Sequence, residues 1–380
     1  MKRCLYCPLV VVALLLANTT PLLAEVSRLY VGTYTRGTDS KGIYVYQFDD
    51  ATGDLEPISI AEGVENPSFL ALDPSQKYLY SSDETDSFDG ESQGAISAWA
   101  IDNKTGSLTL LNNQGAGGTS PCHLSVVPTG NQLLAVGYGS GTVASLPIDA
   151  SGQLQPVSAL VKHHGASIHQ QRQTSPHPHQ IVVDHSGSFA LVPDLGLDQI
   201  LVYRTHDLSH VGATKTAPGA GPRHLAFAPN GYHVYCINEL DLTINSYFYD
   251  RKLGKLTPIE TVSAIADHAD RTGVSGAEIA VHPSGKFLYV SLRGIDEIVA
   301  FTIHPSTGGL EFLERTSTGG KTPRNFALDP SGRWLLAANQ HSDTIRVFRI
   351  GDDGHLTPTD SEADVPAPVC LQFVESDRPK

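Results

Sequence analysis

The stretch TPRNFALDPSGRWLLAANQ, residues 322–340, contains the unit from which the whole chain is built. An apolar run leads into Asp-Pro-Ser-Gly, and a second apolar run follows that turn. Short apolar runs joined by residues that favour turns are typical of the two strands of a β-hairpin. Residues 322–340 therefore predict one antiparallel hairpin.

The same unit recurs along the chain. Each copy begins at a proline or, once, at a glycine: Pro67, Pro121, Pro178, Pro222, Gly276, Pro323 and Pro368. The steps between these positions are 54, 57, 44, 54, 47 and 45 residues, about 50 on average. A repeat of this period indicates an array of equal structural units.

A second turn follows the first in every copy, most clearly in DNKTGSL (102–108) and DRKLGKL (250–256). Each copy thus has two hairpins, or four strands in about 50 residues, which is typical of a propeller blade; solenoid repeats are shorter or helical. We therefore predict an all-β fold, a seven-bladed β-propeller with four-stranded antiparallel blades.

The two ends of the chain complete each other. Residues 28–34 look like the second strand of a unit without its first strand, whereas residues 368–373 look like a first strand without its continuation. Pairing these N- and C-terminal strands in one blade would close the ring and remove its exposed edges. We expect residues 25–380 to form a single propeller domain.

The first 24 residues have the composition of a signal peptide. Lys2 and Arg3 precede an apolar run from Leu9 to Ala17, and Ala24 offers a small residue for cleavage. The run is shorter than the roughly 20 residues that a membrane-spanning helix needs. We predict that residues 1–24 are removed, and that the mature protein is periplasmic or secreted and does not bind the membrane.

Charge, cysteine content and missing motifs exclude several functions. The net charge of −14 becomes −16 without Lys2 and Arg3, which opposes binding to nucleic acid. The three mature cysteines, Cys122, Cys236 and Cys370, are odd in number and far apart, so they predict no disulfide framework. The chain lacks the G-x-S-x-G, P-loop and dinucleotide-binding motifs, and we expect no cofactor.

Charged residues concentrate at one mouth of the predicted ring. The start of the first strand and the end of the second strand of each blade emerge on the same face, because the two strands are antiparallel. These positions hold His179, Arg223, His224, Glu278, Arg324 and Asn325 on first strands, and Glu84, Asp194, Asn238, Glu239, Arg293 and Asn339 on second strands. The opposite mouth holds ordinary turn residues, so we expect function and a central pocket at the first mouth.

Five motifs, taken in order, resemble the seven-bladed lactonase family, which includes bacterial 6-phosphogluconolactonase and the fungal carboxymuconate-cyclising enzyme. The motifs are SPHPHQ (175–180), GPRHLAF (221–227), INEL (237–240), LRG (292–294) and the stretch 322–340. The resemblance covers essentially the whole mature chain. It implies that His179, Arg223, Glu239 and Arg293 act in catalysis.

Lactone hydrolysis needs a base that activates water, a donor for the oxyanion and a group that holds an anionic substituent. Glu239, or His179 oriented by it, could be the base, and Arg223 and Arg293 could bind the anion and the oxyanion. The same arginines could instead only neutralise nearby glutamates in ion pairs. The residues expected to bind substrate are Arg324, Asn325, Glu278 and His224.

No metal is expected, although two patterns resemble metal sites. Six histidines lie in one 23-residue stretch: His163, His164, His169, His177, His179 and His185. No cysteine or carboxylate accompanies them, so we interpret this stretch as a lid beside the mouth. Asp194, Asn238 and Asn339 with Glu84 or Glu239 would suit calcium, but three arginines at the same mouth oppose a divalent cation.

We therefore expect a metal-independent hydrolase of a sugar-type lactone, 6-phosphogluconolactonase-like, with a small-molecule lactone as its partner. Phosphorylated sugars are chiefly cytosolic, so export favours a non-phosphorylated lactone. Two alternatives stay open: an intramolecular lactonising isomerase of the carboxymuconate kind, and a non-catalytic extracellular propeller that binds a ligand. The sequence does not indicate the oligomeric state.

Overall fold

The hairpin predicted at residues 322–340 is present in the computed structural model, which describes residues 26–266 and 268–374. Its strands, β24 (Pro323–Leu328) and β25 (Trp334–Asn339), pair antiparallel. The predicted signal peptide lies outside the described residues.

Asp329 holds the turn of this hairpin. Its carboxylate accepts hydrogen bonds from the backbone N–H groups of Ser331 (2.9 Å) and Trp334 (2.7 Å). Gly332 adopts a φ of +73°, which glycine reaches without the steric cost of a Cβ atom. The Asp-Pro-Ser-Gly sequence is therefore a self-contained turn that fixes where one strand ends and the next begins.

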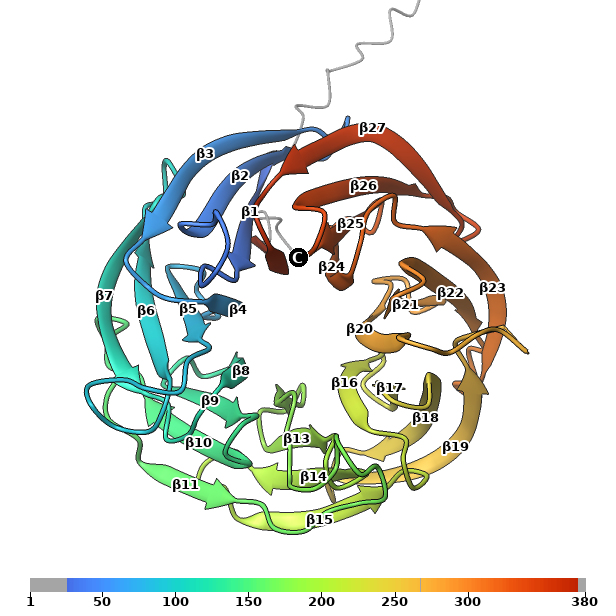
Figure 1. Ribbon diagram of the computed structural model, residues 1–380, viewed down its shortest axis with the longest axis horizontal. Helices are drawn as coiled ribbons and strands as arrows, with labels where there is room; N and C mark the ends of the chain where they lie inside the picture. Colours follow the sequence, from blue (N-terminus) through green and yellow to red (C-terminus); the bar gives the residue numbers. More distant parts are fainter. Residues whose placement is uncertain (1–25, 267, 375–380) are drawn as a thin grey trace, which may run out of the picture.

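The repeated units form seven four-stranded antiparallel sheets arranged as blades in a ring around a central axis (Figure 1). The described residues hold no helix that is long and apolar enough to cross a membrane. The remaining strands of the first four blades are β1 (Val26–Thr33), β2 (Gly42–Asp49), β3 (Leu55–Glu62), β4 (Pro67–Leu72), β5 (Tyr78–Asp83), β6 (Ala95–Ile101), β7 (Leu108–Gly115), β8 (Pro121–Val126), β9 (Gln132–Gly137), β10 (Thr142–Pro147), β11 (Ala159–Lys162), β12 (Val182–Val183), β13 (Phe189–Asp194), β14 (Gln199–Arg204) and β15 (His210–Lys215).

The later blades follow the same plan. Their strands are β16 (Pro222–Phe227), β17 (His233–Asn238), β18 (Thr243–Asp250), β19 (Lys255–Ser263), β20 (Ser275–Val281), β21 (Phe287–Arg293), β22 (Glu297–Ile303), β23 (Leu310–Ser317), β26 (Thr344–Ile350), β27 (Leu356–Asp364) and β28 (Pro368–Val374). The inner strands that face the central axis are β4, β8, β12, β16, β20, β24 and β28.

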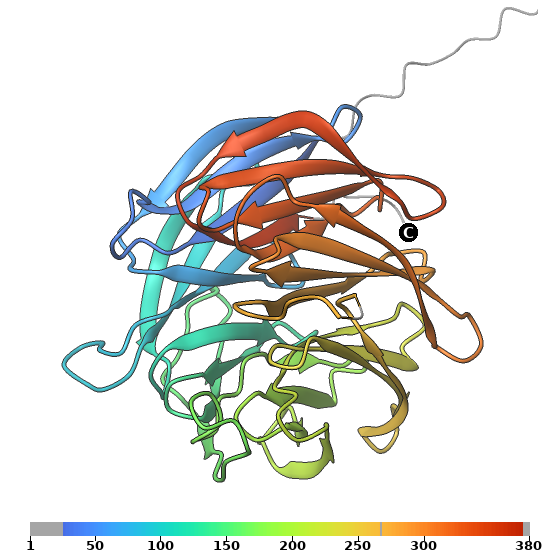
Figure 2. The same cartoon turned by 45° about the vertical axis from the view of Figure 1, so that its right-hand side comes forward.

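The ring closes where the two ends of the chain meet, as predicted. β28 pairs antiparallel with β1 and completes the sheet β28-β1-β2-β3; Figure 2 shows the ends of the colour scale, blue and red, side by side. Phe373 of β28 packs edge to face on Phe48 of β2, with ring centroids 5.3 Å apart. The seven-bladed, ring-closed fold class is therefore confirmed.

Neighbouring blades are joined by apolar packing and by a recurring hydrogen bond. A tyrosine O–H or tryptophan N–H on the second strand of one blade donates a hydrogen bond to a backbone carbonyl in the outer hairpin turn of the next blade. The pairs are Tyr30 to Gly106 (2.9 Å), Tyr80 to Gly152 (3.0 Å), Tyr289 to Gly354 (2.9 Å) and Trp334 to Asp50 (2.9 Å). These donors and acceptors lie in the buried zone between blades, where an unpaired polar group would be costly. The bonds therefore also fix how each blade is set against its neighbour.

The blade formed by β12–β15 departs from the predicted pattern. Its inner strand was expected to start at Pro178, but only Val182–Val183 forms a ladder. Pro178 forms an isolated antiparallel bridge with Asp194, and the rest of the segment before β12 runs as a loop. His179 therefore lies on a loop rather than on a strand, where its N–H donates to the Pro193 carbonyl (3.0 Å).

Candidate active site

The starts of the inner strands and the ends of the second strands meet at one mouth of the ring, as predicted. Six of the eight expected site residues line a narrow cavity there: His179, Arg223, His224, Glu278, Arg324 and Asn325. Glu239 directly follows β17 and binds Arg223, and Arg293 ends β21 and binds Glu239. The open space of about 10 Å³ is room for roughly one water molecule.

Glu239 is the centre of a buried ion-pair cluster. Its Oε2 accepts a hydrogen bond from Arg223 Nε (3.0 Å) and lies 3.1 Å from Arg293 Nη2, while its Oε1 accepts from Arg172 Nη2 (2.5 Å). Burial acts to raise the pKa of Glu239, but the three guanidinium groups outweigh it and lower the pKa to about 2. A carboxylate held so firmly in its ionised form is a weak proton acceptor near neutral pH.

Arg172 is the member of this cluster that sequence reasoning missed. It lies in the histidine-rich loop, and its Nη2 also reaches Tyr138 Oη (3.3 Å). The loop is anchored beside it, because Gln173 Nε2 donates to the Leu195 carbonyl (2.8 Å). A long loop has no strand register, so spacing could not place Arg172 over the mouth; the expectation of a lid was the only signal that pointed to it.

His224 and Glu278 form a second buried pair. His224 Nδ1 lies 3.0 Å from Glu278 Oε1, and Asn325 Nδ2 donates to the other carboxylate oxygen (2.5 Å). Burial acts to raise the pKa of Glu278, but His224 and then Arg223 bring it below its usual value. Burial also lowers the pKa of His224, although Glu278 partly opposes this. Near neutral pH the pair is thus an ionised carboxylate that accepts the Nδ1–H of a neutral imidazole.

Three imidazole rings pack edge to face beside this pair. The His224 ring centroid lies 5.1 Å from that of His179 and 5.5 Å from that of His123. Burial lowers the pKa of His179 well below its usual value, so this ring is neutral as well. No hydrogen bond joins His179 to Glu239 among the described residues, and His179 Nδ1 faces Cys122 Sγ at 4.0 Å.

Arg324 differs from the other arginines at this mouth. The ion pairs around Glu239 do not include it, and within the described residues no side chain accepts a hydrogen bond from it. Its guanidinium carbon lies 5.4 Å from the centroid of the Tyr34 ring, and Tyr34 Oη donates to Glu84 Oε2 (2.9 Å). A half-buried guanidinium without a direct counter-charge is suited to bind a carboxylate or a phosphate.

One residue of each metal-like pattern, His163 and Asp194, is engaged in structural hydrogen bonds. His163 Nδ1 lies 2.6 Å from Asp194 Oδ2, and Tyr203 Oη donates to His163 Nε2 (2.9 Å). The other oxygen of Asp194 accepts from the backbone N–H of His177 (2.8 Å). In the part of the chain that the structure describes, no three His, Cys, Asp or Glu side chains are grouped as metal ligands. Cys122, Cys236 and Cys370 are buried and unpaired.

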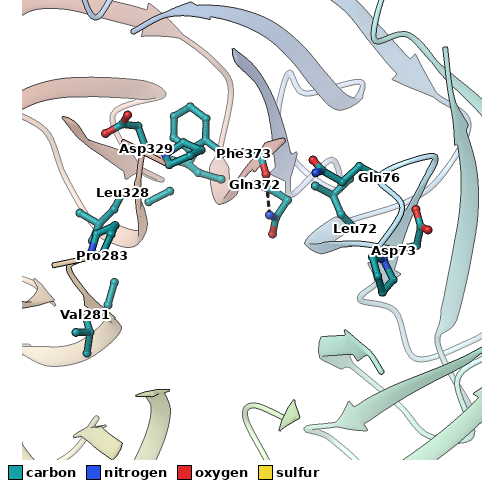
Figure 3. Close-up of a pocket in the computed structure, with 14 residues that line it drawn as sticks. Leu72, Asp73, Gln76, Val281, Pro283, Leu328, Asp329, Gln372 and Phe373 are labelled. Atoms are coloured by element: carbon teal, nitrogen blue, oxygen red, sulfur yellow. Dashed lines mark hydrogen bonds between the residues drawn. The ribbon is translucent and has the colours of Figure 1, made fainter. Parts of the chain in front are cut away.

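A much larger cavity, about 780 Å³, opens at the opposite mouth, where the inner strands end (Figure 3). Figure 3 shows Leu72, Val281 and Leu328 spaced around it. Its two carboxylates, Asp73 and Asp329, are occupied in holding hairpin turns. The central pocket predicted at the first mouth is therefore present, with the ionisable side chains around it, but it is much smaller than the cavity at the opposite mouth.

Comparison with known proteins agrees with this geometry. Residues 28–373 match the family model described as "Lactonase, 7-bladed beta-propeller". The 6-phosphogluconolactonase of Bacillus subtilis is 37% identical over 349 residues, 91% of this chain and 97% of that protein. That of Formosa agariphila is 34% identical over 330 residues, 84% of this chain and 92% of that protein.

Among solved structures, the periplasmic gluconolactonase of Pseudomonas aeruginosa is similar, with a TM-score of 0.86 and 33% identity, covering 92% of this chain and 99% of that chain. The family predicted from the motifs is confirmed, because the matching model spans most of the chain. The chain therefore belongs to the seven-bladed β-propeller lactonase family, a family of lactone-hydrolysing enzymes.

Proposed function

We propose that this protein hydrolyses a sugar-type lactone, as the name 6-phosphogluconolactonase describes for its relatives, at the mouth that holds Arg324 and the histidines. The observation that carries the proposal is the Arg324 guanidinium, which makes no direct ion pair among the described residues, beside neutral imidazoles around a cavity with room for about one water molecule. A guanidinium can hold the anionic group or the developing oxyanion of a lactone, and a neutral imidazole can take a proton from water.

The predicted site residues take different roles in this proposal. Arg324 binds the substrate, and the lactone ring lies above the cavity because the cavity itself is too narrow for it. Asn325, predicted to bind substrate, has its amide engaged by Glu278 and by the Leu371 N–H. Arg293 supports the oxyanion, since its side chain is 14% exposed and its Nε has no hydrogen-bond partner among the described residues. Preorganised cationic donors of this kind stabilise negative charge that develops in the transition state.

Arg223 and Glu239 hold this arrangement in place. Arg223 is fully enclosed, with its Nε on Glu239 and its Nη1 donating to the Ala277 carbonyl (2.6 Å). Because the three arginines already occupy the Glu239 carboxylate and lower its pKa to about 2, we assign Glu239 to positioning. The proton of the attacking water goes to the imidazole of His179 or of His224.

We further propose that residues 1–24 are cleaved, that residues 25–380 are periplasmic or secreted, and that the preferred substrate is a non-phosphorylated aldonolactone. The support is the basic and apolar composition of residues 1–24 and the similar protein from Pseudomonas aeruginosa, which is named a periplasmic gluconolactonase. N-terminal sequencing of the exported protein should give Glu25 as the first residue. An intact Met1 on exported protein would contradict the cleavage.

The test of the proposed function is ring opening by residues 25–380 of glucono-1,5-lactone and 6-phosphogluconolactone, each measured against the spontaneous rate. Because the site is proposed to work without metal, a chelator should not change turnover. Faster opening of the unphosphorylated lactone supports the proposed substrate class. If neither lactone opens faster than in buffer, the hydrolase proposal fails. A lactone formed from an added unsaturated dicarboxylate would instead support the isomerase.

A further inference from the structure

One ring nitrogen of His224 is buried without a hydrogen-bond partner. His224 Nδ1 is bound to Glu278, but His224 Nε2 is fully buried and has no hydrogen-bond partner among residues 26–266 and 268–374. The side chain is only 4% exposed and lines the cavity at the mouth. A buried nitrogen without a partner costs stability, so its persistence calls for a functional explanation.

We propose that His224 is the general base of lactone opening, and that Glu278, itself held by Asn325, is the positioning residue that fixes its tautomer. The assignment rests on the proposed function and names the residue that carries its proton transfer. The Nδ1–H of His224 points at Glu278 Oε1, which leaves the lone pair on Nε2. A nucleophile, a base and a group that orients the base form the arrangement that activates water in many hydrolases.

Water opens the lactone ring by addition to the carbonyl carbon followed by loss of the ring oxygen. The oxygen of a water molecule in the cavity forms a bond to the carbonyl carbon of the lactone while His224 Nε2 takes one of its protons. The carbonyl electron pair moves to the oxygen, beside the arginines. When the tetrahedral intermediate collapses, the bond to the ring oxygen breaks and that oxygen takes the proton from Nε2. The product is a hydroxy acid, and His224 returns to its neutral form.

His224 fits this role better than its neighbours do. Glu239 is engaged by three guanidinium groups. His179 has a thiol rather than a carboxylate beside its Nδ1, so nothing there would stabilise its protonated form. The ionised Glu278 faces His224 and would stabilise the imidazolium that forms when Nε2 accepts a proton.

The charged groups around His224 set the expected pH dependence. Glu278 of β20 favours its protonated form, whereas Arg223 of β16 and Arg324 of β24 oppose it; His123 and His179 pack against the ring. The base is active when neutral, so turnover should be lost at acid pH as His224 becomes protonated. Replacing Glu278 by Gln removes the favourable charge, so the acid limb should move to lower pH.

The experiment compares wild type with three variants on whichever lactone wild type opens. His224→Gln should lower kcat by about 100-fold or more, the usual contribution of a positioned general base. Glu278→Gln should lower kcat by about 10-fold or more and shift the acid limb of the kcat/KM profile to lower pH. His123→Gln is the matched control, because His123 is similarly buried (4% exposed, against 3% for His224) and belongs to the same ring cluster; it should retain kcat within a few fold.

Each outcome bears on the assignment. If His224→Gln keeps kcat within tenfold of wild type, His224 is not the base, although an active wild type would still support the proposed function. If Glu278→Gln leaves the acid limb in place, Glu278 does not tune the base and the assignment fails. If His123→Gln loses as much activity as His224→Gln, His224 acts only through packing and the assignment fails as well. An inactive wild type overturns both proposals. Should His224→Gln not fold, the pH profile of Glu278→Gln decides.

Discussion

The arginines at the mouth have different roles that depend on their partners. Arg223 is buried and bound to Glu239, and burial together with Arg293 and Arg324 lowers its pKa to about 10 despite that partner. Arg324 has no direct counter-charge among the described residues. Removing a buried, paired charge leaves its partner uncompensated, whereas removing an unpaired one leaves no such defect. We therefore expect substitution of Arg223 to lower the stability of the protein, and substitution of Arg324 to weaken substrate binding without lowering stability.

The first prediction concerns Arg324→Gln. We expect kcat/KM for the anionic test lactone, 6-phosphogluconolactone, to fall by about 10- to 100-fold, the value of a charge-assisted hydrogen bond of roughly 1.5–3 kcal/mol. The midpoint of thermal unfolding should stay unchanged, because no ion pair is lost. Steady-state kinetics and thermal unfolding check both parts, with Arg346→Gln, whose ion pair with Glu362 lies away from the mouth, as the control. A large loss of stability in Arg324→Gln would show that Arg324 is structural.

The second prediction concerns Glu239→Gln. At pH 7 the variant should be less stable than wild type by about 3–5 kcal/mol, because three arginines lose their shared carboxylate. The folded pKa of about 2 lies below the ordinary value of 4.5. The contribution of Glu239 is therefore fully present above pH 4.5 and is lost as the pH falls towards 2.

Denaturant unfolding of wild type and Glu239→Gln at several pH values measures this difference. The gap between the two proteins should narrow steadily below pH 4.5. Glu362→Gln is the control, since that pair is exposed and exposed ion pairs contribute about 0–1 kcal/mol. A gap that stays constant down to pH 2 would contradict the lowered pKa of Glu239.

At the scale of elements, strands of neighbouring blades lie so close together that side-chain size is limited where blades meet. Gly32 of β1 illustrates this: a Cβ atom there would lie 2.6 Å from the Pro67 carbonyl oxygen and 3.2 Å from Cys370 Cβ. The first of these contacts is with backbone, which cannot rotate away. Gly32 thus allows β1, β4 and β28 to approach one another at the closing blade.

The third prediction follows from this contact. Gly32→Ala should lower the free energy of unfolding by about 1–3 kcal/mol, as overpacking of a close-packed site does. Gly212→Ala is the matched control, because Gly212 is also on a strand and nothing lies within 4 Å of its Cβ position. Chemical unfolding of both variants tests the idea. Equal stability of the two variants would mean that β1 and β4 can move apart without cost.

At the scale of the whole molecule, one strand joins the ends of the chain. β28 comes from the C-terminus, yet it is the inner strand of a sheet whose other strands come from the N-terminus. Its Phe373 lies in the same apolar cluster as Phe48 of that sheet and Trp334 of the preceding blade. A closed ring removes exposed strand edges, so loss of this contact should weaken the ring as a unit.

The fourth prediction is that Phe373→Ala destabilises the ring by about 3–5 kcal/mol, the usual cost of removing a buried phenylalanine side chain. The loss should appear in one coincident transition of far-UV circular dichroism and tryptophan fluorescence, because Trp99 and Trp334 lie in the blades on either side of the closing sheet. Phe312→Ala is the control, since Phe312 is 49% exposed. Separate transitions for the two signals would contradict cooperative closure.

The architecture could be predicted from sequence because its causes are local and repeated. The Asp-Pro-Ser-Gly turn at 329–332 carries its own hydrogen bonds, and seven copies of one unit leave few ways to arrange the blades. The antiparallel pairing of the first two strands in each blade then placed eight site residues at one mouth. The prediction of a continuous inner strand from Pro178 was wrong, because only a bridge at Pro178 and the short ladder of β12 form there.

The chemistry of the mouth was decided by the tertiary structure. Register predicted that Glu239, Arg223 and His224 would share a mouth, but ionisation and tautomer depend on burial and on distances of a few ångströms between separate blades. The contact of Arg172 with Glu239 joins a loop to a different blade, and no periodicity relates them. The sequence by itself therefore determined the fold and the composition of the mouth, because turns and strand alternation are local. Only the closed ring decided that the Glu239 carboxylate is held by arginines and that His224 Nε2 is left without a hydrogen-bond partner, because the groups concerned come from separate blades.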